Sequence, residues 1–408
     1  MLIENVHLLD PRSGFDGICT IETEGEIIRS IKKSEGEGSG ITAVPGFVDG
    51  HSHFRDPGFT EKEDILSGAR AAAAGGYTSV VCMANTKPPV DSVETLRYVL
   101  DKGQTTPIHI YSSAAVTIGL KGKALSDLAA LAEAGAVCFT DDGMPIRDEE
   151  LLKEAMKIAA SLDIPILLHE EDPRYVRRPG TDATAPREAE ISLVSRDIGL
   201  AGETGARILI QHVSCKESVR LIKEGHARKI KVYGEVTPHH LSLTSDAVKK
   251  YGTIAKVNPP LRTETDRQAL MDGVSDGTLY MIGTDHAPHK STEKEQPLFE
   301  APSGMIGLET SFSLCLRELV GSGRISLMKL IELMTLRPAE FFGLDAGYIA
   351  EGGPADITLI DLNRRHLQDS FRSKASNSPF RGQTLPGTIV RTICRGQVVF
   401  EETKTDDK

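Results

Sequence analysis

The chain has few features of a secreted, membrane-bound or nucleic-acid-binding protein. It has no run of about 18 apolar residues and no signal or transit peptide. Its 6 cysteines include no Cys-x-x-Cys pair, so we expect buried free thiols in a reducing compartment. Acidic residues outnumber basic ones, which gives a net charge of −11. This charge argues against nucleic acid or a membrane surface as a partner. The sequence therefore predicts a cytoplasmic protein, and its 408 residues suffice for one large enzyme domain and a small one.

Short apolar segments alternate with amphipathic helical patterns along the middle of the chain. The segments are rich in Val, Ile or Leu, as is typical of strands that are buried on both faces. Eight strand–helix units in series predict an α/β protein with a (β/α)8 TIM barrel over residues 43–344. The expected strands are Pro45–Val48, Thr78–Met83, Ile108–Ser112, Ala136–Thr140, Ile166–His169, Ile208–His212, Lys231–Val236 and Tyr280–Thr284.

The two ends of the chain have a different pattern. Residues 1–42 contain alternating apolar and polar segments separated by acidic and Gly-rich turns, and residues 345–408 return to this pattern. Strict alternation is typical of strands with one buried face. We therefore predict a small β-sandwich-like domain that is formed from both termini.

The most informative motif is a His-x-His-x-Arg sequence that follows the apolar run 43–48. Because side chains of a strand alternate between its faces, His51 and His53 project from the same face, with Arg55 one step further on it. Two neutral nitrogen ligands beside a permanent cation suit a metal ion with an anionic substrate next to it.

Further polar side chains follow the other predicted strands. The carboxyl ends of barrel strands form the active site in such folds, so we expect these side chains to converge. Histidine and carboxylate ligands without thiolate suit zinc, or manganese or iron, and the set is large enough for two ions. Asp141 and Asp142 are adjacent, so only one of them can face the barrel mouth, and the pattern does not decide which. The strand-end residues are Asn85, Asp141 or Asp142, His169, His212, Asp285 and His289, with His239 and His240 expected to be structural or to lie behind the ligands.

Taken together, these motifs resemble the amidohydrolase superfamily and, within it, the metal-dependent dihydroorotases of type I. The resemblance runs along nearly the whole chain. Its most specific elements are Pro45–Gly58, Asn85-Thr86-Lys87-Pro88, Thr140-Asp141-Asp142-Gly143, Glu235–His240, Asn258-Pro259-Pro260-Leu261-Arg262 and Thr284–His289.

The resemblance implies a metal site and a reaction. His51 and His53 would bind one metal with Asp285, His169 and His212 would bind a second, and Asp142 would bridge the two. The implied cofactor is Zn²⁺, two per subunit, bridged by Asp142 and hydroxide. The implied reaction is the reversible cyclisation of N-carbamoyl-L-aspartate to (S)-dihydroorotate in de novo pyrimidine (UMP) biosynthesis, with a metal-activated hydroxide and Asp285 as general acid and base.

The resemblance also implies a substrate site. Arg55, Asn85 and His289 would hold the substrate carboxylate, and Asn258, Ser303 and Gly304 would lie near the ring, with His53 also counted among the substrate-binding residues. Many members of the superfamily bridge their metals with a carbamylated lysine on strand four. That strand has no lysine here, so an aspartate is expected to take its place.

Several alternatives stay open at this point. An allantoinase or hydantoinase would share the first and last motifs, and Arg55 with Asn85 is the feature that argues against it. A non-catalytic scaffold for aspartate transcarbamoylase is a second alternative, although the full ligand set favours a working enzyme. A homodimer and an association with aspartate transcarbamoylase are the macromolecular partners considered. We also hypothesise that residues 289–303 form a mobile lid over the site.

Overall fold

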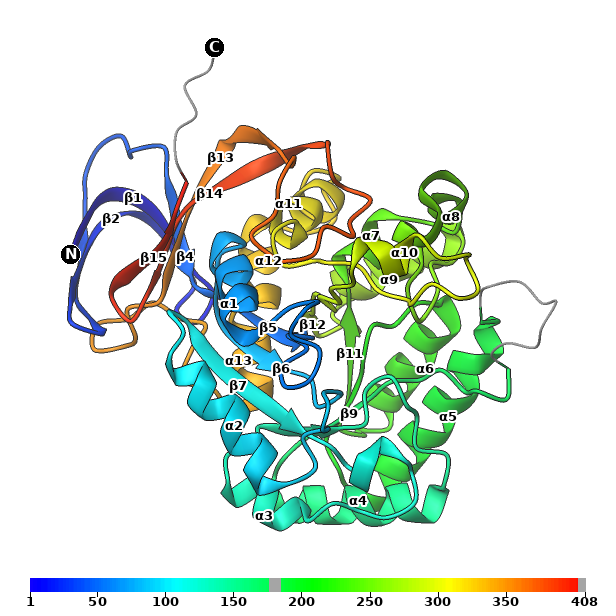
Figure 1. The fold of residues 1–408 in the computed structure, drawn as a ribbon. Helices are drawn as coiled ribbons and strands as arrows, with labels where there is room; N and C mark the ends of the chain where they lie inside the picture. The colour runs from blue at the N-terminus through cyan, green and yellow to red at the C-terminus, as the bar shows by residue number, and fades with distance from the viewer. Residues whose placement is uncertain (176–184, 403–408) are drawn as a thin grey trace.

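Two β-sheets organise the computed structural model, which describes residues 1–175 and 185–402 (Figure 1). One sheet has eight strands, which lie side by side in the order of the sequence and pair in parallel. These strands are β5 (Phe47–Ser52), β6 (Tyr77–Cys82), β7 (His109–Ala114), β8 (Cys138–Thr140), β9 (Ile166–Leu168), β10 (Ile208–Ile210), β11 (Val232–Val236) and β12 (Met281–Ile282).

The first and last strands of this sheet meet through the residues that follow β12. Ser52 and His286 form a parallel bridge, and the His53 N–H donates to the His286 carbonyl over 2.9 Å. The buried carboxylate of Asp49 adds a second link, because it accepts from both the backbone N–H (2.9 Å) and the hydroxyl (2.7 Å) of Thr284. The sheet therefore closes on itself, and the predicted (β/α)8 barrel is confirmed.

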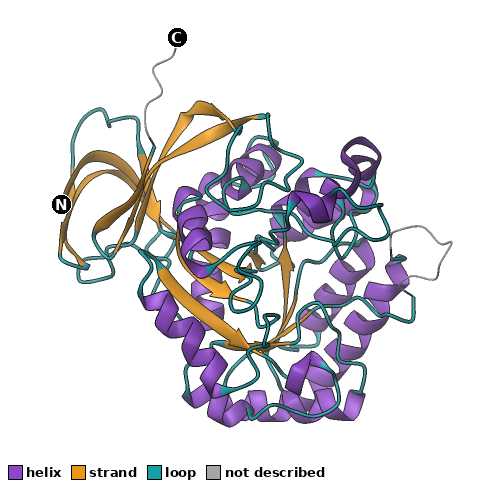
Figure 2. Cartoon of the chain, viewed as in Figure 1, coloured by secondary structure: helices purple, strands orange, loops and turns teal. Residues whose placement is uncertain are grey.

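Helices surround the barrel (Figure 2). Side-chain caps begin several of them, for example Asp64 before α1 and Thr263 before α9, which satisfies backbone N–H groups that a helix leaves unpaired. One helix after each strand covers the sheet: α1 (Ile65–Ala74), α2 (Val93–Gln104), α3 (Leu128–Glu133), α4 (Glu149–Leu162), α5 (Arg187–Thr204), α6 (Lys216–Ala227), α9 (Glu264–Asp276) and α11 (Ser311–Cys315). The other helical segments are η1 (Ile118–Leu120), α7 (Pro238–Ser242), α8 (Asp246–Tyr251), η2 (Gly252–Ala255), α10 (Ser291–Lys294), η3 (Leu316–Val320), α12 (Leu327–Met334) and α13 (Leu336–Phe342).

The interior of the barrel is packed rather than hollow. Side chains from several strands, including Val81, Leu167 and Leu209, form one buried cluster with Phe341 and Phe342 of α13. Because apolar side chains fill the interior, polar strand-end residues are left to face the open, carboxyl end of the barrel.

Strands from both termini form the second sheet, a mixed sheet of seven strands in the order β15-β14-β13-β4-β1-β2-β3. This confirms that the two ends of the chain assemble together. The strands are β1 (Leu2–Asp10), β2 (Phe15–Glu24), β3 (Ile27–Lys33), β4 (Thr42–Pro45), β13 (Ile357–Leu367), β14 (Thr384–Cys394) and β15 (Gln397–Glu401). Figure 1 shows this sheet beside the barrel, with the N-terminus on its outer side.

The boundary between the two sheets corrects one predicted strand. The first barrel strand does not cover Pro45–Val48: Pro45 ends β4, which pairs with β1 and β13, and the barrel strand begins at Phe47. Gly46 lies between them, where an added Cβ would come within 2.1 Å of the Thr78 hydroxyl. The domain boundaries after residues 42 and 344 stay a prediction, and residues 403–408 of the second domain lie outside the described residues.

All six cysteines are buried free thiols. No helix within the two described ranges is long and apolar enough to cross a membrane.

Candidate metal centre and substrate site

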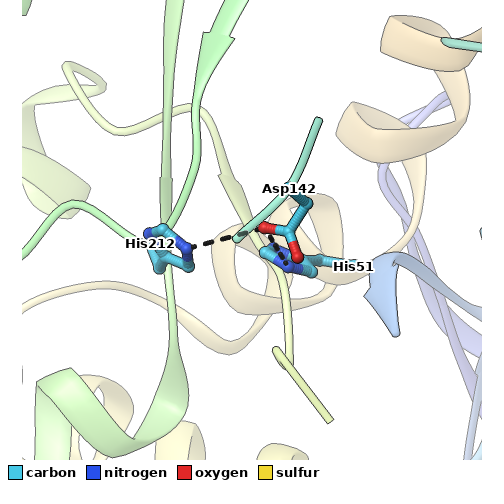
Figure 3. Close-up of side chains that lie close together, drawn as sticks. All are labelled: His51, Asp142 and His212. Carbon is cyan, nitrogen blue, oxygen red and sulfur yellow. Dashed lines mark ion pairs between the residues drawn. The ribbon is translucent and has the colours of Figure 1, made fainter. Parts of the chain in front are cut away.

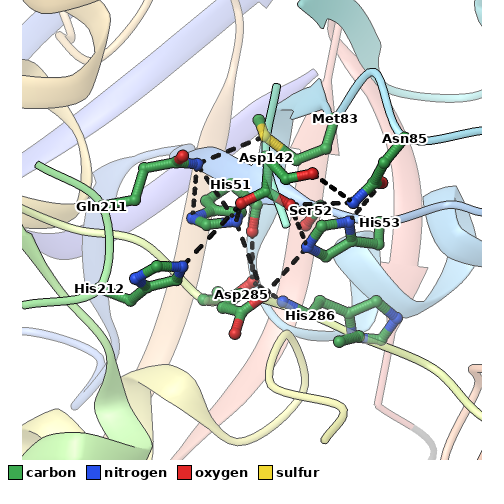
Figure 4. A network of polar contacts seen from close by, with 12 residues as sticks. His51, Ser52, His53, Met83, Asn85, Asp142, Gln211, His212, Asp285 and His286 are labelled. Atoms are coloured by element: carbon green, nitrogen blue, oxygen red, sulfur yellow. Dashed lines mark hydrogen bonds and ion pairs between the residues drawn. The ribbon is translucent and has the colours of Figure 1, made fainter. Parts of the chain in front are cut away.

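Six buried side chains from five strand ends gather at the open end of the barrel, and Figure 4 labels five of them, all except His169. Each one follows, or lies at the end of, a strand that the neighbouring helices hold in place. β5 supplies two of them and β8, β9, β10 and β12 supply one each: His51 and His53, Asp142, His169, His212 and Asp285. The structure thus brings together all the residues that were expected to bind metal.

Asp142 lies at the centre of this group (Figure 3). Its Oδ1 atom is 3.5 Å from His51 Nε2, 3.6 Å from His169 Nδ1 and 3.9 Å from His212 Nε2. Its Oδ2 atom is 3.5 Å from His53 Nε2. These separations are long for hydrogen bonds, but ligand atoms held at 2.0–2.2 Å around a tetrahedral ion are about 3.4 Å apart. Asp142 Oδ1 is buried and has no hydrogen-bond partner among the described residues, so the site fits a cation.

Asp285 provides a second carboxylate. Its Oδ1 atom is 3.1 Å from His53 Nε2 and 3.6 Å from His51 Nε2. Two sets of donor atoms therefore converge, and both include His51: one with His53 and Asp285, the other with Asp142 and His212. Imidazole and carboxylate groups are typical ligands of catalytic metal ions. This buried cluster is therefore suited to hold one or more metal ions.

Two oxygen acceptors, of which Glu235 is fully buried, fix the orientation of the His51 and His53 rings. Glu235 Oε1 is 2.8 Å from His51 Nδ1, and Asn85 Oδ1 is 2.9 Å from His53 Nδ1. Because both partners are oxygen acceptors, each Nδ1 donates its proton to them, and each Nε2 is the ring nitrogen that faces the aspartates and could bind a metal ion. The Asn85 amide also donates to Asp142 Oδ2 over 3.0 Å, which links the two sets of ligands.

Glu235 and Gln211 are site residues that were not predicted. Glu235 is fully buried and also accepts from the His212 N–H over 3.1 Å, while Gln211 Nε2 lies 3.2 Å from His51 Nδ1. One sequence feature could have revealed Glu235: it is an acidic residue at the end of an apolar strand, where a buried charge needs a specific partner.

The charges around the cluster keep the carboxylates ionised. Burial by itself would raise the pKa of Asp142, but contacts with the His169 and His51 rings hold that pKa well below its usual range. The pKa of Asp285 is lowered in the same way, against the effect of burial, by His53 and His51. An ionised carboxylate is the form that binds a cation.

The backbone is strained at three of the strand ends. Arg55, His212 and Asp285 have positive φ angles of 58°, 35° and 45°. Such angles are uncommon for residues other than glycine and persist where surrounding structure holds them, which is frequent at functional sites.

The choice between the two adjacent aspartates is settled by their hydrogen bonds. Asp141 accepts from the Thr117 N–H over 3.0 Å and from the Thr117 hydroxyl, and burial raises the pKa of Asp141 to about 6. Asp142 is therefore the residue that faces the cluster. His240 is a structural residue, as expected, because its ring contacts the Thr237 hydroxyl (2.7 Å) and the Pro259 carbonyl (3.0 Å).

A cavity of about 390 Å³ opens beside the candidate ligands. His51 lies beneath it and is fully buried. The lining includes every residue that was expected to contact the substrate: His53, Arg55, Asn85, Asn258, His289, Ser303 and Gly304.

One wall of this cavity carries a cation within a network of hydrogen bonds. Arg55 Nη2 lies 3.5 Å from His289 Nε2, and the same nitrogen of His289 is 2.9 Å from the Ser303 carbonyl. The Ser303 hydroxyl donates in turn to Asn258 Oδ1 over 2.9 Å. Burial and the nearby Arg55 charge lower the pKa of His289 to about 2, so Arg55 is the permanent positive charge of this wall.

A third group of potential metal ligands lies away from this cavity. His109 Nε2 is 2.9 Å from Asp356 Oδ2, near Cys394. Arg395, which can only donate, lies 3.4 Å from His109 Nδ1, so Nδ1 is the acceptor and Nε2 keeps its proton. A metal ion needs the Nε2 lone pair, and this tautomer does not offer it.

Comparison with known proteins gives the family. The sequence pattern of the amidohydrolase family matches residues 42–399. The chain is 46% identical to the dihydroorotase of Clostridium acetobutylicum, over 98% of this chain and 100% of that one. The chain belongs to the amidohydrolase family and, within it, to the dihydroorotases. The chain is also 44% identical to the dihydroorotase of Clostridioides difficile, over 98% of this chain and 99% of that one. It is 45% identical to the dihydroorotase of Streptococcus pneumoniae, over 98% of this chain and 100% of that one.

Solved structures of other amidohydrolases have the same fold. An L-hydantoinase (dihydropyrimidinase) from Arthrobacter aurescens superposes with a TM-score of 0.90 at 27% identity, over 99% of this chain and 96% of that one. A dihydropyrimidinase from Brevibacillus agri gives a TM-score of 0.85 at 23% identity, over 98% and 95%, and this likeness concerns the fold alone.

Proposed function

We propose that the protein catalyses the reversible ring closure of N-carbamoyl-L-aspartate to (S)-dihydroorotate. The observation that carries this proposal is the position of Arg55, on the wall of a polar cavity whose floor is the His–Asp cluster. A guanidinium is suited to bind a carboxylate, and dihydroorotate carries a carboxylate on its ring whereas hydantoin does not. The identity of 44–46% with curated dihydroorotases supports the same substrate.

The proposed cofactor is zinc, with two ions per chain. His51, His53 and Asp285 would hold one ion, and His169 and His212 would hold the other, with Asp142 in contact with both. The absence of thiolate among these ligands and the unsatisfied Asp142 oxygen support this assignment. When bound, such ions supply Lewis acidity, which polarises a carbonyl and makes water acidic enough to react near neutral pH.

Asp285 is the proposed general acid and base. Its carboxylate lines the cavity, and its lowered pKa keeps it ionised. In ring opening, Asp285 would take the proton of the attacking water and deliver it to the ring nitrogen as the amide carbon–nitrogen bond breaks. In ring closure, the same carboxylate would take a proton from the ureido nitrogen as that nitrogen attacks the side-chain carboxyl carbon, and would pass the proton to the hydroxyl oxygen of that carboxyl group, which leaves as water.

The remaining residues of the cavity would position the substrate. Arg55 and His289 would bind its carboxylate, and Asn258 with the backbone of Ser303 and Gly304 would lie along its ring. Asn85 already bonds His53 and Asp142, so its amide would serve the ligands as well as the substrate. A homodimer and an association with aspartate transcarbamoylase stay predictions from the sequence.

Substrate discrimination tests this proposal. The purified protein is assayed with dihydroorotate, hydantoin and allantoin under the same conditions. We expect turnover of dihydroorotate and little or none of the other two, because only dihydroorotate offers a carboxylate to Arg55. Faster turnover of hydantoin or allantoin would assign the protein to the alternative reaction, and no turnover of any of them would favour the scaffold.

A further inference from the structure

The long connection between β13 and β14 reaches the walls of the cavity. This connection, residues 368–383, belongs by sequence to the terminal β-domain, which had been given no part in the site. Figure 1 shows it as the orange loop beyond the two strands. Within it, Asn377 is buried, with 3% of its surface exposed.

The Asn377 side chain joins two segments that line the cavity. Its Oδ1 atom accepts from the His289 N–H over 3.2 Å, and its Nδ2 atom donates to the carbonyls of Ala287 and Gly304, both over 3.1 Å. The Asn377 carbonyl also accepts from the Ile306 N–H over 3.2 Å. A single buried amide thus bonds the segment after β12 and the segment at 304–306 at the same time.

Other contacts leave these two segments little freedom. The Gly304 carbonyl also accepts from Lys294 Nζ over 2.9 Å, and the Gly304 N–H donates to the Lys256 carbonyl over 2.8 Å. A Cβ built on Gly304 would lie 2.7 Å from the Ala287 Cβ and 3.1 Å from His289 Nε2. The two segments therefore lie close together, and Asn377 bonds both of them.

The same connection supports the residue that follows Asp285. The Ser373 hydroxyl and the Lys374 N–H donate to Glu63, which is fully buried. Glu63 lies 3.4 Å from His286 Nε2, while His286 Nδ1 accepts from the Gly307 N–H. The segment after β13 thus contacts the residues that follow Asp285, directly at Ala287 and His289 and through Glu63 at His286.

We propose that Asn377 is a positioning residue for substrate binding, so that the terminal domain supplies part of the substrate site. It touches no substrate atom itself; it fixes His289 and Gly304 at the distance that a bound ring with its carboxylate requires. This inference rests on the proposed function for the identity of the substrate. An error of about 1 Å in such placement can cost a large factor in rate or affinity, whatever the other contacts are.

Asn377→Asp tests the proposal at nearly constant volume. The carboxylate can still accept from the His289 N–H, but it has no hydrogen to donate and would face the two carbonyl oxygens. We expect the KM for dihydroorotate to rise about tenfold or more, with a much smaller change in kcat and unchanged metal content. Asn363→Asp, at an exposed position of β13, is the matched control and should behave as the unaltered protein.

Amide hydrogen exchange tests the same inference without substrate. In Asn377→Asp we expect faster exchange at 287–289 and 304–306 and no change on β6 or β9. An unchanged KM, or unchanged exchange in these segments, would overturn the positioning role. Loss of folding in both Asn377→Asp and Asn377→Ser would also overturn it, because Asn377 would then be needed for the fold rather than for the site.

These measurements separate the inference from the proposed function. If the unaltered protein does not turn over dihydroorotate, the proposed function fails, and the exchange experiment still decides whether Asn377 holds the two segments together. If the unaltered protein is active and the variant has the same KM, the inference fails and the proposed function stands.

Discussion

Glu235 Oε1 lies 2.8 Å from Nδ1 of His51, and both side chains are fully buried. This contact directs the Nδ1 proton at Glu235, so that Nε2 of His51, which belongs to both sets of candidate ligands, is the nitrogen that faces the aspartates. A carboxylate behind a ligating histidine orients the ring and makes it a stronger ligand.

Replacing Glu235 should weaken metal binding. Glu235→Gln keeps the shape of the side chain but removes the charge, so we expect metal affinity to fall about 10–100-fold. Metal content after dialysis against a graded series of chelator concentrations measures this change. Glu401→Gln, at an exposed position of β15, is the control, and equal metal retention by both variants would contradict the role of Glu235.

Replacing Asp285 should separate chemistry from metal binding. In Asp285→Asn the other candidate ligands remain, so we expect metal to be retained while turnover falls about 10³-fold or more, because the proton-transfer group is gone. Metal analysis and the rate of dihydroorotate hydrolysis are measured on the same sample. Near-normal turnover would refute the assignment of Asp285 as general acid and base.

Replacing Arg55 should weaken substrate binding more than it slows the chemistry. Arg55→Ala removes the only permanent cation that we assign to the substrate carboxylate, and we expect the KM for carbamoyl aspartate to rise at least tenfold. Arg55→Lys should recover part of the loss, because a lysine keeps the charge without the paired donors. Arg220→Ala, exposed on α6, is the control, and an unchanged KM in Arg55→Ala would contradict the assignment.

Lys294 should make stability depend on pH. Burial, together with the charge of Lys256, lowers the pKa of Lys294 from 10.5 to about 7. Between these two values the unfolded chain binds a proton that the folded chain does not, so the free energy of unfolding gains a contribution that rises with pH, by up to about 1.4 kcal/mol per pH unit.

Comparison of two variants isolates this contribution. The stability of the unaltered protein relative to Lys294→Met should increase as the pH rises from about 7 to about 10, as measured by denaturant unfolding. The control variant Lys249→Met, exposed on α8, should show no such trend. A difference between the unaltered protein and Lys294→Met that does not vary with pH would contradict the shifted pKa of Lys294.

The sequence predicted the barrel and the ligands because both depend on local patterns. Buried parallel strands are apolar over a few consecutive residues, and strand-end residues of a barrel converge whatever their separation along the chain. The two features together were enough to bring His51, His169 and Asp285 into one site before any contact was known.

The residues that were missed act through contacts between distant parts of the chain. Glu235 is 184 positions from His51, and Asn377 is 88 positions from His289. The hydrophobic periodicity of the sequence does not reveal which of such distant residues are in contact. The choice of Asp142 over Asp141 likewise depended on the hydrogen bonds that Thr117 donates to Asp141, and the exact start of the first barrel strand depended on sheet pairing on either side of Gly46.

The central claim is that the buried His–Asp cluster holds the metal on which dihydroorotate ring opening depends. An ultraviolet assay of ring opening, made on the purified protein before chelation, after chelation and after zinc is restored, tests it most directly. We expect turnover before chelation, loss of turnover in the metal-free protein and recovery with zinc. Full turnover by the metal-free protein, or failure of the zinc-restored protein to open dihydroorotate, would contradict the account.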